Sequence, residues 1–286
     1  MNSVGTYVSQ WGEGPIWYQD KLIYIDIEGQ KVLTFDPARH EEQVWDVGER
    51  VGTVVPRASG GLVIAGASGF RFLDTKTGEI EPWIDPESGL PGTRFNDGKC
   101  DPKGRFWAGS MDLGKPRQPI GALYRLDTDH SVDKLFDEVS VSNGIVWNKA
   151  ADTMYYIDTP RAKVEAFDYD NDSGAITNRR TVIDTTGMTG VPDGMAMDDD
   201  ENLWVAMCHG GQVQCFDPRA QTPENPVHVL RLPVMEPTAV AFGGPDLEDL
   251  YITTGLPSDD AGREDGLLFC AQIDGVRGRP ATPFAG

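Results

Sequence analysis

The sequence lacks a long apolar run and is poor in positive charge. No stretch approaches the roughly 18 consecutive apolar residues of a transmembrane helix. The first residues, MNSVGTYVSQWGEGP, do not place a basic region before an apolar one, so we expect a cytoplasmic protein. Lysine and arginine number 25 against 45 acidic residues, and the net charge is −20. A field of this sign repels phosphate groups, so no nucleic acid and no membrane surface is an expected partner.

Cysteine is scarce too, and no two cysteines have the CxxC spacing of a thiolate metal site. The four cysteines stand singly inside apolar runs. This placement favours small buried side chains over a disulfide framework or a zinc site built from thiolates. A bridge between Cys208 and Cys215 across a hairpin stays open as an alternative.

Long helical periodicity is also absent, and two families of short fragments recur instead. Members of the first family are strands that end in an acidic residue, 38 to 57 residues apart, at Asp36, Asp74, Asp127, Asp168, Asp217 and Asp274. Members of the second are polar turns that open into an apolar strand: GEGPIW, VGTVVP, TRFNDGKC, VSNGIVW, VPDGMAM and EPTAVAF. Each family counts six repeats, and a repeat at this spacing is typical of propellers and solenoids.

Each repeat contains about four short strands bounded by Gly, Pro, Asn and Asp. In the fourth repeat, for example, we predict strands at 144–147, 153–158, 163–169 and 177–184. Four strands per repeat predict an all-β, six-bladed β-propeller in which residues 1–286 form a single domain. The sixth repeat ends after its third strand, and residues 4–10 are predicted to form a strand that belongs to no repeat. We therefore expect this N-terminal strand to join the last blade and close the ring, which also covers an open strand edge.

In such a ring, the loop before each innermost strand and the loop between the second and third strands reach the same face, where function concentrates. The loops before the innermost strands, called leading loops below, carry Glu13, Arg94, Asn96, Asn143 and Asp193. Taken singly these are ordinary turn residues. Because ring closure points equivalent positions at one axis, we predict that Glu13, Asn96, Asn143 and Asp193 converge. Two carboxylates with one or two amide oxygens suit a single Ca²⁺, Mg²⁺, Mn²⁺ or loosely held Zn²⁺ ion.

The chain resembles the regucalcin (senescence marker protein) and gluconolactonase family. The fragments GEGPIW, RFNDGKCDPKGRFWAGSM, SNGIVW, FDYDNDSGAITNRR, PDGMAMDDDENLWVA and FGGPDLEDLYIT carry the resemblance, which runs from about residue 12 to residue 286. It implies a six-bladed propeller in which Glu13, Asn143 and Asp193 hold the metal. It also implies that Arg94 and Asn96 contact a sugar lactone. The acidic substrate contact that some relatives have after the GSM-like segment is missing, and Asp112 is a candidate replacement.

The function expected from this resemblance is metal-dependent hydrolysis of a sugar lactone to the sugar acid. We expect the metal to act as a Lewis acid and Asp193 to take a proton from the attacking water. Asp158 and His209, on the same face, are further candidates for substrate binding. The alternatives are a related lactonase or organophosphate-type esterase with the same metal site, and a calcium-binding propeller without activity. We expect a monomer or a weak homo-oligomer.

Overall fold

The computed structural model describes residues 1–257, 262 and 264–286, and its strands form six four-stranded antiparallel sheets. From the centre outward, the first three sheets are β2 (Gly12–Tyr18), β3 (Lys21–Asp26), β4 (Lys31–Asp36), β5 (Glu41–Asp46); β6 (Val51–Pro56), β7 (Leu62–Gly66), β8 (Gly69–Leu73), β9 (Ile80–Ile84); and β10 (Thr93–Cys100), β11 (Phe106–Asp112), β12 (Gly121–Leu126), β13 (Val132–Val139).

The remaining sheets are β14 (Ser142–Trp147), β15 (Thr153–Asp158), β16 (Lys163–Tyr169), β17 (Ile176–Asp184); β18 (Val191–Met197), β19 (Leu203–Cys208), β20 (Gln212–Phe216), β21 (His228–Arg231); and β22 (Pro237–Gly243), β23 (Asp249–Thr254), β24 (Leu268–Gln272), β1 (Asn2–Val4). The short 3-10 helix η1 (Thr159–Arg161) follows β15. No helix among the described residues is long and apolar enough to cross a membrane.

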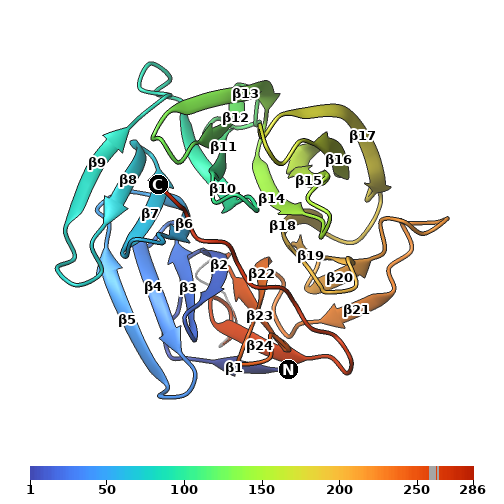
Figure 1. Ribbon diagram of the computed structural model, residues 1–286. Coiled ribbons are helices and arrows are strands. Elements are labelled where there is room, and N and C mark those ends of the chain that lie inside the picture. The colour runs from blue at the N-terminus through green and yellow to red at the C-terminus, as the bar shows by residue number, and fades with distance from the viewer. Residues whose placement is uncertain (258–261, 263) are drawn as a thin grey trace.

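Figure 1 shows the six sheets as blades around one axis. Each innermost strand contacts the innermost strands of both neighbouring blades, so the ring is closed. The predicted six-bladed β-propeller is confirmed. In the fourth blade the predicted strands 144–147 and 177–184 differ by one or two residues from the observed β14 and β17. The other two strands of that blade have the predicted bounds.

The N-terminal strand completes the last blade, as expected, but it is shorter and earlier than 4–10. Strand β1 pairs with β24 through Asn2–Val4 alone, and Figure 1 shows the two side by side. The strand ends because Gly5 takes a left-handed conformation with φ of 74°. The next two N–H groups, of Thr6 and Tyr7, then donate to the Glu42 carboxylate in the first blade at 3.0 to 3.1 Å.

Three of the recurring aspartates at the ends of the third strands, Asp36, Asp74 and Asp217, form side-chain turns. Asp36 Oδ1 accepts the backbone N–H groups of Ala38 and Arg39, and Asp74 does the same for the residues two and three positions ahead. A short acidic side chain can bond to nearby backbone in this way and so starts the turn toward the fourth strand. In these blades the aspartate of the first repeat family therefore marks the turn between the third and fourth strands.

A β-bulge interrupts each of the six innermost strands near its first residues. The register shifts fall between Glu13 and Ile16, Val51 and Thr53, Phe95 and Gly98, Asn143 and Ile145, Pro192 and Met195, and Pro237 and Ala239. A bulge bends the strand and re-aims its side chains. These six bulges lie at equivalent places around the axis, and the acidic and amide residues of the second repeat family lie at four of them.

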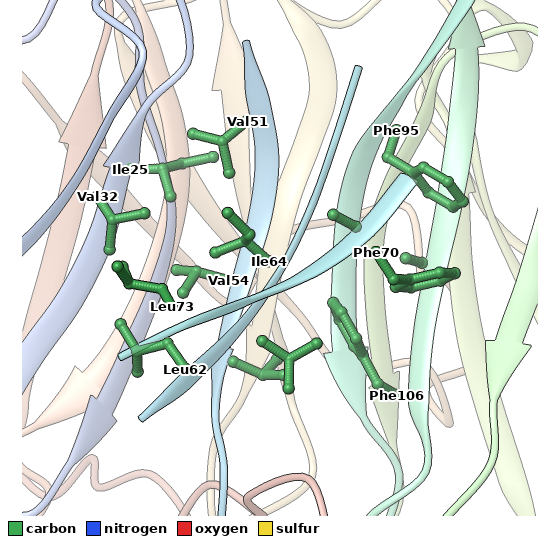
Figure 2. Close-up of a cluster of buried hydrophobic side chains, with 14 of the residues drawn as sticks. Ile25, Val32, Val51, Val54, Leu62, Ile64, Phe70, Leu73, Phe95 and Phe106 are labelled. Carbon is green, nitrogen blue, oxygen red and sulfur yellow. The ribbon is translucent and has the colours of Figure 1, made fainter. Parts of the chain in front are cut away.

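The core lies between the faces of neighbouring blades. Strands β6 and β7 are buried along their whole length, whereas the fourth strands β5, β13 and β21 are partly exposed. Inner strands therefore read as continuous apolar runs, because both of their faces pack against protein. Figure 2 shows part of the largest cluster, where Phe70 from the second blade contacts Phe95 and Phe106 from the third at ring-centroid distances of 4.8 and 5.6 Å.

The C-terminal segment 277–286 crosses one face of the ring, as the red ribbon in Figure 1 shows. The Gly278 N–H donates to the Leu247 carbonyl of the sixth blade, and the Phe284 N–H donates to the Pro56 carbonyl of the second blade. The Phe284 side chain is fully buried in the cluster of the first three blades. The segment therefore links blades that are not neighbours in the ring.

Candidate functional site

The closed ring brings four of the predicted side chains into one buried cluster. Glu13, Asn96, Asn143 and Asp193 come from blades one, three, four and five, and each is less than 8% exposed. In the two remaining blades the bulge carries a threonine. Thr53 Oγ1 donates to the Gly98 carbonyl, and Thr238 Oγ1 donates to the Gly12 carbonyl. These two hydroxyls join neighbouring blades, which explains why the second and sixth repeats supply no carboxylate or amide at this position.

A chain of hydrogen bonds fixes the orientation of the Asn143 amide. The Thr159 hydroxyl donates to the Pro192 carbonyl at 2.8 Å, so it accepts the bond from Asn143 Nδ2 at 2.7 Å. Asn143 Oδ1 therefore points the opposite way, where it accepts from Asn96 Nδ2 at 3.0 Å. The Asn143 oxygen is thus held on the side of the cluster.

Asn96 is fully engaged by protein groups. Its Nδ2 also donates to the Ser142 carbonyl at 2.7 Å, and its Oδ1 accepts from Arg94 Nη1 at 2.8 Å. An amide with both ends occupied is a positioning group. The sequence left Asn96 open as a metal ligand or as a lactone contact; its hydrogen bonds add a third role, in which it holds Asn143 and Arg94, and disfavour direct ligation.

Arg94 is a buried guanidinium whose hydrogen bonds go to neutral groups. Its Nη1 donates to the Phe95 carbonyl and to Asn96 Oδ1, and its Nε has no hydrogen-bond partner among the described residues. Burial lowers the pKa of Arg94 to about 10, and the Glu28 carboxylate counteracts this effect. A buried, incompletely satisfied arginine is well suited to bind an oxygen-rich or anionic group.

The carboxylates of Glu13 and Asp193 repel each other, and the Asp97 carboxylate adds to this repulsion. Burial raises the pKa of Glu13 well above its usual range, and the Asp193 and Asp97 carboxylates raise it further. Burial also raises the pKa of Asp193, again with Asp97 as the next cause. Lys99 partly offsets the charge of Asp97, whose own pKa burial raises. Ionisation of these carboxylates is therefore unfavourable in the metal-free cluster, and a nearby divalent cation would favour it.

Sequence reasoning did not select Asp97 and Lys99. Strict alternation along β10 would place residues 96 and 97 on opposite faces. The register shift between Phe95 and Gly98 makes both side chains buried at the axis. The Asp-Gly dipeptide inside RFNDGK was the available signal for this bulge.

Asp112 and Asp158, predicted as substrate contacts, organise loops in this structure. Asp112 Oδ1 accepts from the Gly114 N–H and its Oδ2 from the Gln118 N–H; both bonds lower its pKa. Asp158 is almost fully buried and accepts the N–H of Val141 at 2.9 Å, next to the start of β14. Both carboxylates thus shape the loops around the cluster.

His209, the last predicted substrate contact, lies after β19 with its side chain 64% exposed. Its Nδ1 is 2.6 Å from Oε2 of Glu236, which belongs to the leading loop of the sixth blade. Cys208 donates to the same Glu236 oxygen at 3.4 Å and lies next to Asp193. The donor atoms of Cys208, His209 and Glu236 lie within 4.8 Å of one another and could hold a metal ion. All four cysteines are free, so no Cys208–Cys215 bridge is present.

A cavity of ≈ 130 Å³ lies at the other end of the axis. Its walls include Trp17, Trp147, Met197 and Phe242, which stand at the far ends of their strands, and Arg279 of the C-terminal segment. The segment therefore covers the face opposite Glu13 and Asp193. The cluster of carboxylates and amides lies on the face where the innermost strands begin.

The fold and the cluster together define a six-bladed β-propeller with carboxylate and amide oxygens gathered at one end of its axis. Residues 11–255 match the protein family described as "SMP-30/Gluconolactonase/LRE-like region", and the chain belongs to this family. It is 41% identical to regucalcin of Danio rerio over 283 residues, covering 96% of this chain and 95% of the relative. It is 35% identical to the "Putative sugar lactone lactonase YvrE" of Bacillus subtilis (strain 168), with the same coverage.

A solved structure agrees with the family assignment. The calcium-binding protein regucalcin from Agrobacterium tumefaciens superposes with a TM-score of 0.90 at 27% identity, over 98% of this chain and 95% of the other. The resemblance read from the sequence is confirmed.

Proposed function

We propose that the protein is a metal-dependent hydrolase that opens the ester ring of a sugar lactone to give the sugar acid. The observation that carries the proposal is the buried Arg94 guanidinium beside the oxygen cluster of Glu13, Asn143 and Asp193. The oxygens suit a divalent cation, and the guanidinium suits the hydroxyls of the substrate and the carboxylate of the product. The description of the Bacillus subtilis relative as a sugar lactone lactonase supports this assignment.

The metal ligands in this proposal are Glu13, Asn143 and Asp193. Their hard oxygen atoms fit Ca²⁺, Mg²⁺, Mn²⁺ or a loosely held Zn²⁺, and two ionised carboxylates offset the divalent charge. Burial, and after it repulsion from neighbouring carboxylates, raises the pKa of Glu13 and of Asp193, and such an ion would offset both effects. When bound, the ion would supply Lewis-acid polarisation of the lactone carbonyl.

The chain's own groups then have separate tasks. Asn96 holds the Asn143 oxygen and the Arg94 side chain in place. Asp193 takes a proton from the water that attacks the carbonyl carbon, and the ring C–O bond breaks as the ring oxygen receives a proton. A carboxylate next to a cation is a weak base, but a lactone is an activated ester, so a weak base suffices for its hydrolysis. Arg94 binds the carboxylate as it forms.

A substrate panel tests the activity. Five- and six-membered aldonolactones, aryl esters and phosphotriesters are compared with each divalent metal after chelation. We expect metal-dependent turnover with the highest kcat/KM for an aldonolactone. Faster cleavage of aryl esters or phosphotriesters would assign the chain to the related esterases. Absence of turnover with every substrate and metal would favour a calcium-binding propeller, in line with the description of the Agrobacterium structure as a calcium-binding protein.

A further inference from the structure

We propose that Cys208, His209 and Glu236 form a second metal site, for a borderline-soft divalent cation of the Zn²⁺ class. The site shares no ligand with Glu13, Asn143 or Asp193. It therefore goes beyond the proposed lactonase activity and does not depend on it.

The three donor atoms lie within 4.8 Å of one another, and one of their distances matches that of a zinc site. Around a tetrahedral zinc ion, with bonds of about 2.0 to 2.3 Å, neighbouring ligand atoms lie roughly 3.3–3.6 Å apart. Cys208 Sγ and Glu236 Oε2 are 3.4 Å apart. His209 Nδ1 and Glu236 Oε2 are closer, at 2.6 Å. Binding would move the imidazole outward by less than about 1 Å, and its 64% exposure leaves room for this movement.

The backbone on both sides of the site is fixed. The His209 N–H donates to Glu236 Oε2 at 2.9 Å, and the Gly211 N–H donates to the Met235 carbonyl at 3.1 Å. On the other side, the Gly255 N–H donates to the Glu236 carbonyl at 2.9 Å. The first two bonds connect the turn after β19 to the leading loop of the sixth blade, and the third holds that loop within its own blade. The three donors come from two blades, yet their chain segments are held together without an ion.

The donor set differs in kind from the oxygen cluster. Thiolate, imidazole and carboxylate together select Zn²⁺ over Ca²⁺ and Mg²⁺, which prefer oxygen alone. Binding would release the Cys208 thiol proton, and the resulting thiolate and the Glu236 carboxylate would offset the two positive charges. Cys208 and Glu236 are buried, whereas His209 is exposed. An ion could therefore enter from solvent on the His209 side and keep a coordination position open there.

Titration of the metal-free, reduced protein with Co²⁺ tests the proposal, because only thiolate ligation gives a sulfur-to-cobalt charge-transfer absorption. We expect this absorption in the wild type, its bleaching by Zn²⁺, and its persistence in excess Ca²⁺. Cys208→Ser should abolish it, and Cys215→Ser, at a buried cysteine on β20, should leave it unchanged. Absence of the absorption in the wild type, or its displacement by Ca²⁺, would overturn the proposal.

The other two ligands have their own variants. His209→Gln, at an exposed position, and Glu236→Gln should each weaken Co²⁺ binding at least about tenfold, the smallest effect typical even of outer-shell changes. His228→Gln on β21 is the matched control. Unchanged affinity in both ligand variants would mean that Co²⁺ binds a cysteine alone, and would also overturn the proposal. Glu13→Gln should keep the absorption while losing lactone hydrolysis, so either proposal can be refuted without the other.

Discussion

Asn96 donates from Nδ2 to Asn143 Oδ1 at 3.0 Å, across the boundary between the third and fourth blades. This bond and the Thr159 bond on the other end of Asn143 hold one amide oxygen at the axis. In the proposed metal site, Asn96 is therefore an outer group that orients a ligand. Outer groups of this kind typically contribute 10- to 100-fold to metal affinity.

Asn96→Ala should weaken Ca²⁺ binding by about 10- to 100-fold, because Asn143 loses the partner that orients it. Calorimetric titration of the chelator-treated protein measures the change. Asn225→Ala, at an exposed position in the fifth blade, is the control and should bind as the wild type does. Equal affinities in the two variants would show that Asn143 is not a ligand or does not need Asn96.

Arg94→Lys should lower kcat/KM for a sugar lactone by about 10- to 150-fold, the equivalent of one charge-assisted hydrogen bond of 1.5–3 kcal/mol. A lysine keeps the charge but loses the planar fork. Inhibition by the sugar-acid product should weaken in parallel. Arg50→Lys, at an arginine that pairs with Glu28 on the surface, should leave both quantities unchanged. A normal kcat/KM in Arg94→Lys would remove Arg94 from the substrate site.

The raised pKa of Glu13 predicts a pH-dependent stability of the metal-free protein. Because this pKa is higher in the folded than in the unfolded state, the folded state is destabilised as pH rises above the unfolded value near 4.3. In chelator at pH 8, Glu13→Gln should melt higher than the wild type, by roughly 2–4 °C per kcal/mol relieved. The difference should shrink as the pH falls toward about 4.

The same variant should lose the metal-induced rise in melting temperature, since binding to the folded state is what produces that rise. Glu81→Gln, at an exposed position on β9, should follow the wild type at every pH, with and without metal. If Glu13→Gln melted at a lower temperature than the wild type in chelator at pH 8, the claim that ionised Glu13 destabilises the metal-free folded state would be wrong.

Phe284→Ala tests the role of the C-terminal segment. The fully buried ring joins the core of the first three blades, so its loss should lower the free energy of unfolding by about 3–5 kcal/mol. Phe284→Leu should cost less than about 1.5 kcal/mol. Denaturant unfolding measures both values. Because the segment crosses the face opposite Asp193, kcat/KM should stay unchanged in either variant, and a large loss of activity would refute this separation of the two faces.

The ring was predictable because its two repeat families have local causes. The Asp36 and Asp74 turns and the polar starts of the innermost strands depend on neighbouring residues alone, so they leave a local sequence signal. The bounds of β1 were not predictable, because the Glu42 carboxylate that binds the residues after Gly5 lies far along the chain.

The convergence of Glu13, Asn96, Asn143 and Asp193 followed from the ring itself. The position of the Asp97 side chain could not be predicted in this way, because a bulge breaks the alternation of side chains between the two faces of the strand. The contact of His209 with Glu236 joins two blades through loop conformation, including a left-handed φ of 61° at His209. No spacing rule relates those residues.

The most direct test of the central claim is lactone hydrolysis by the wild type, Glu13→Gln and Asp193→Asn after chelation and stepwise addition of metal. We predict that the wild type loses activity in chelator and regains it with one divalent metal. Both variants should stay at least about 100-fold below it at the same metal concentration, since each lacks a proposed ligand. Full metal-dependent activity in either variant would contradict the site proposed for this propeller.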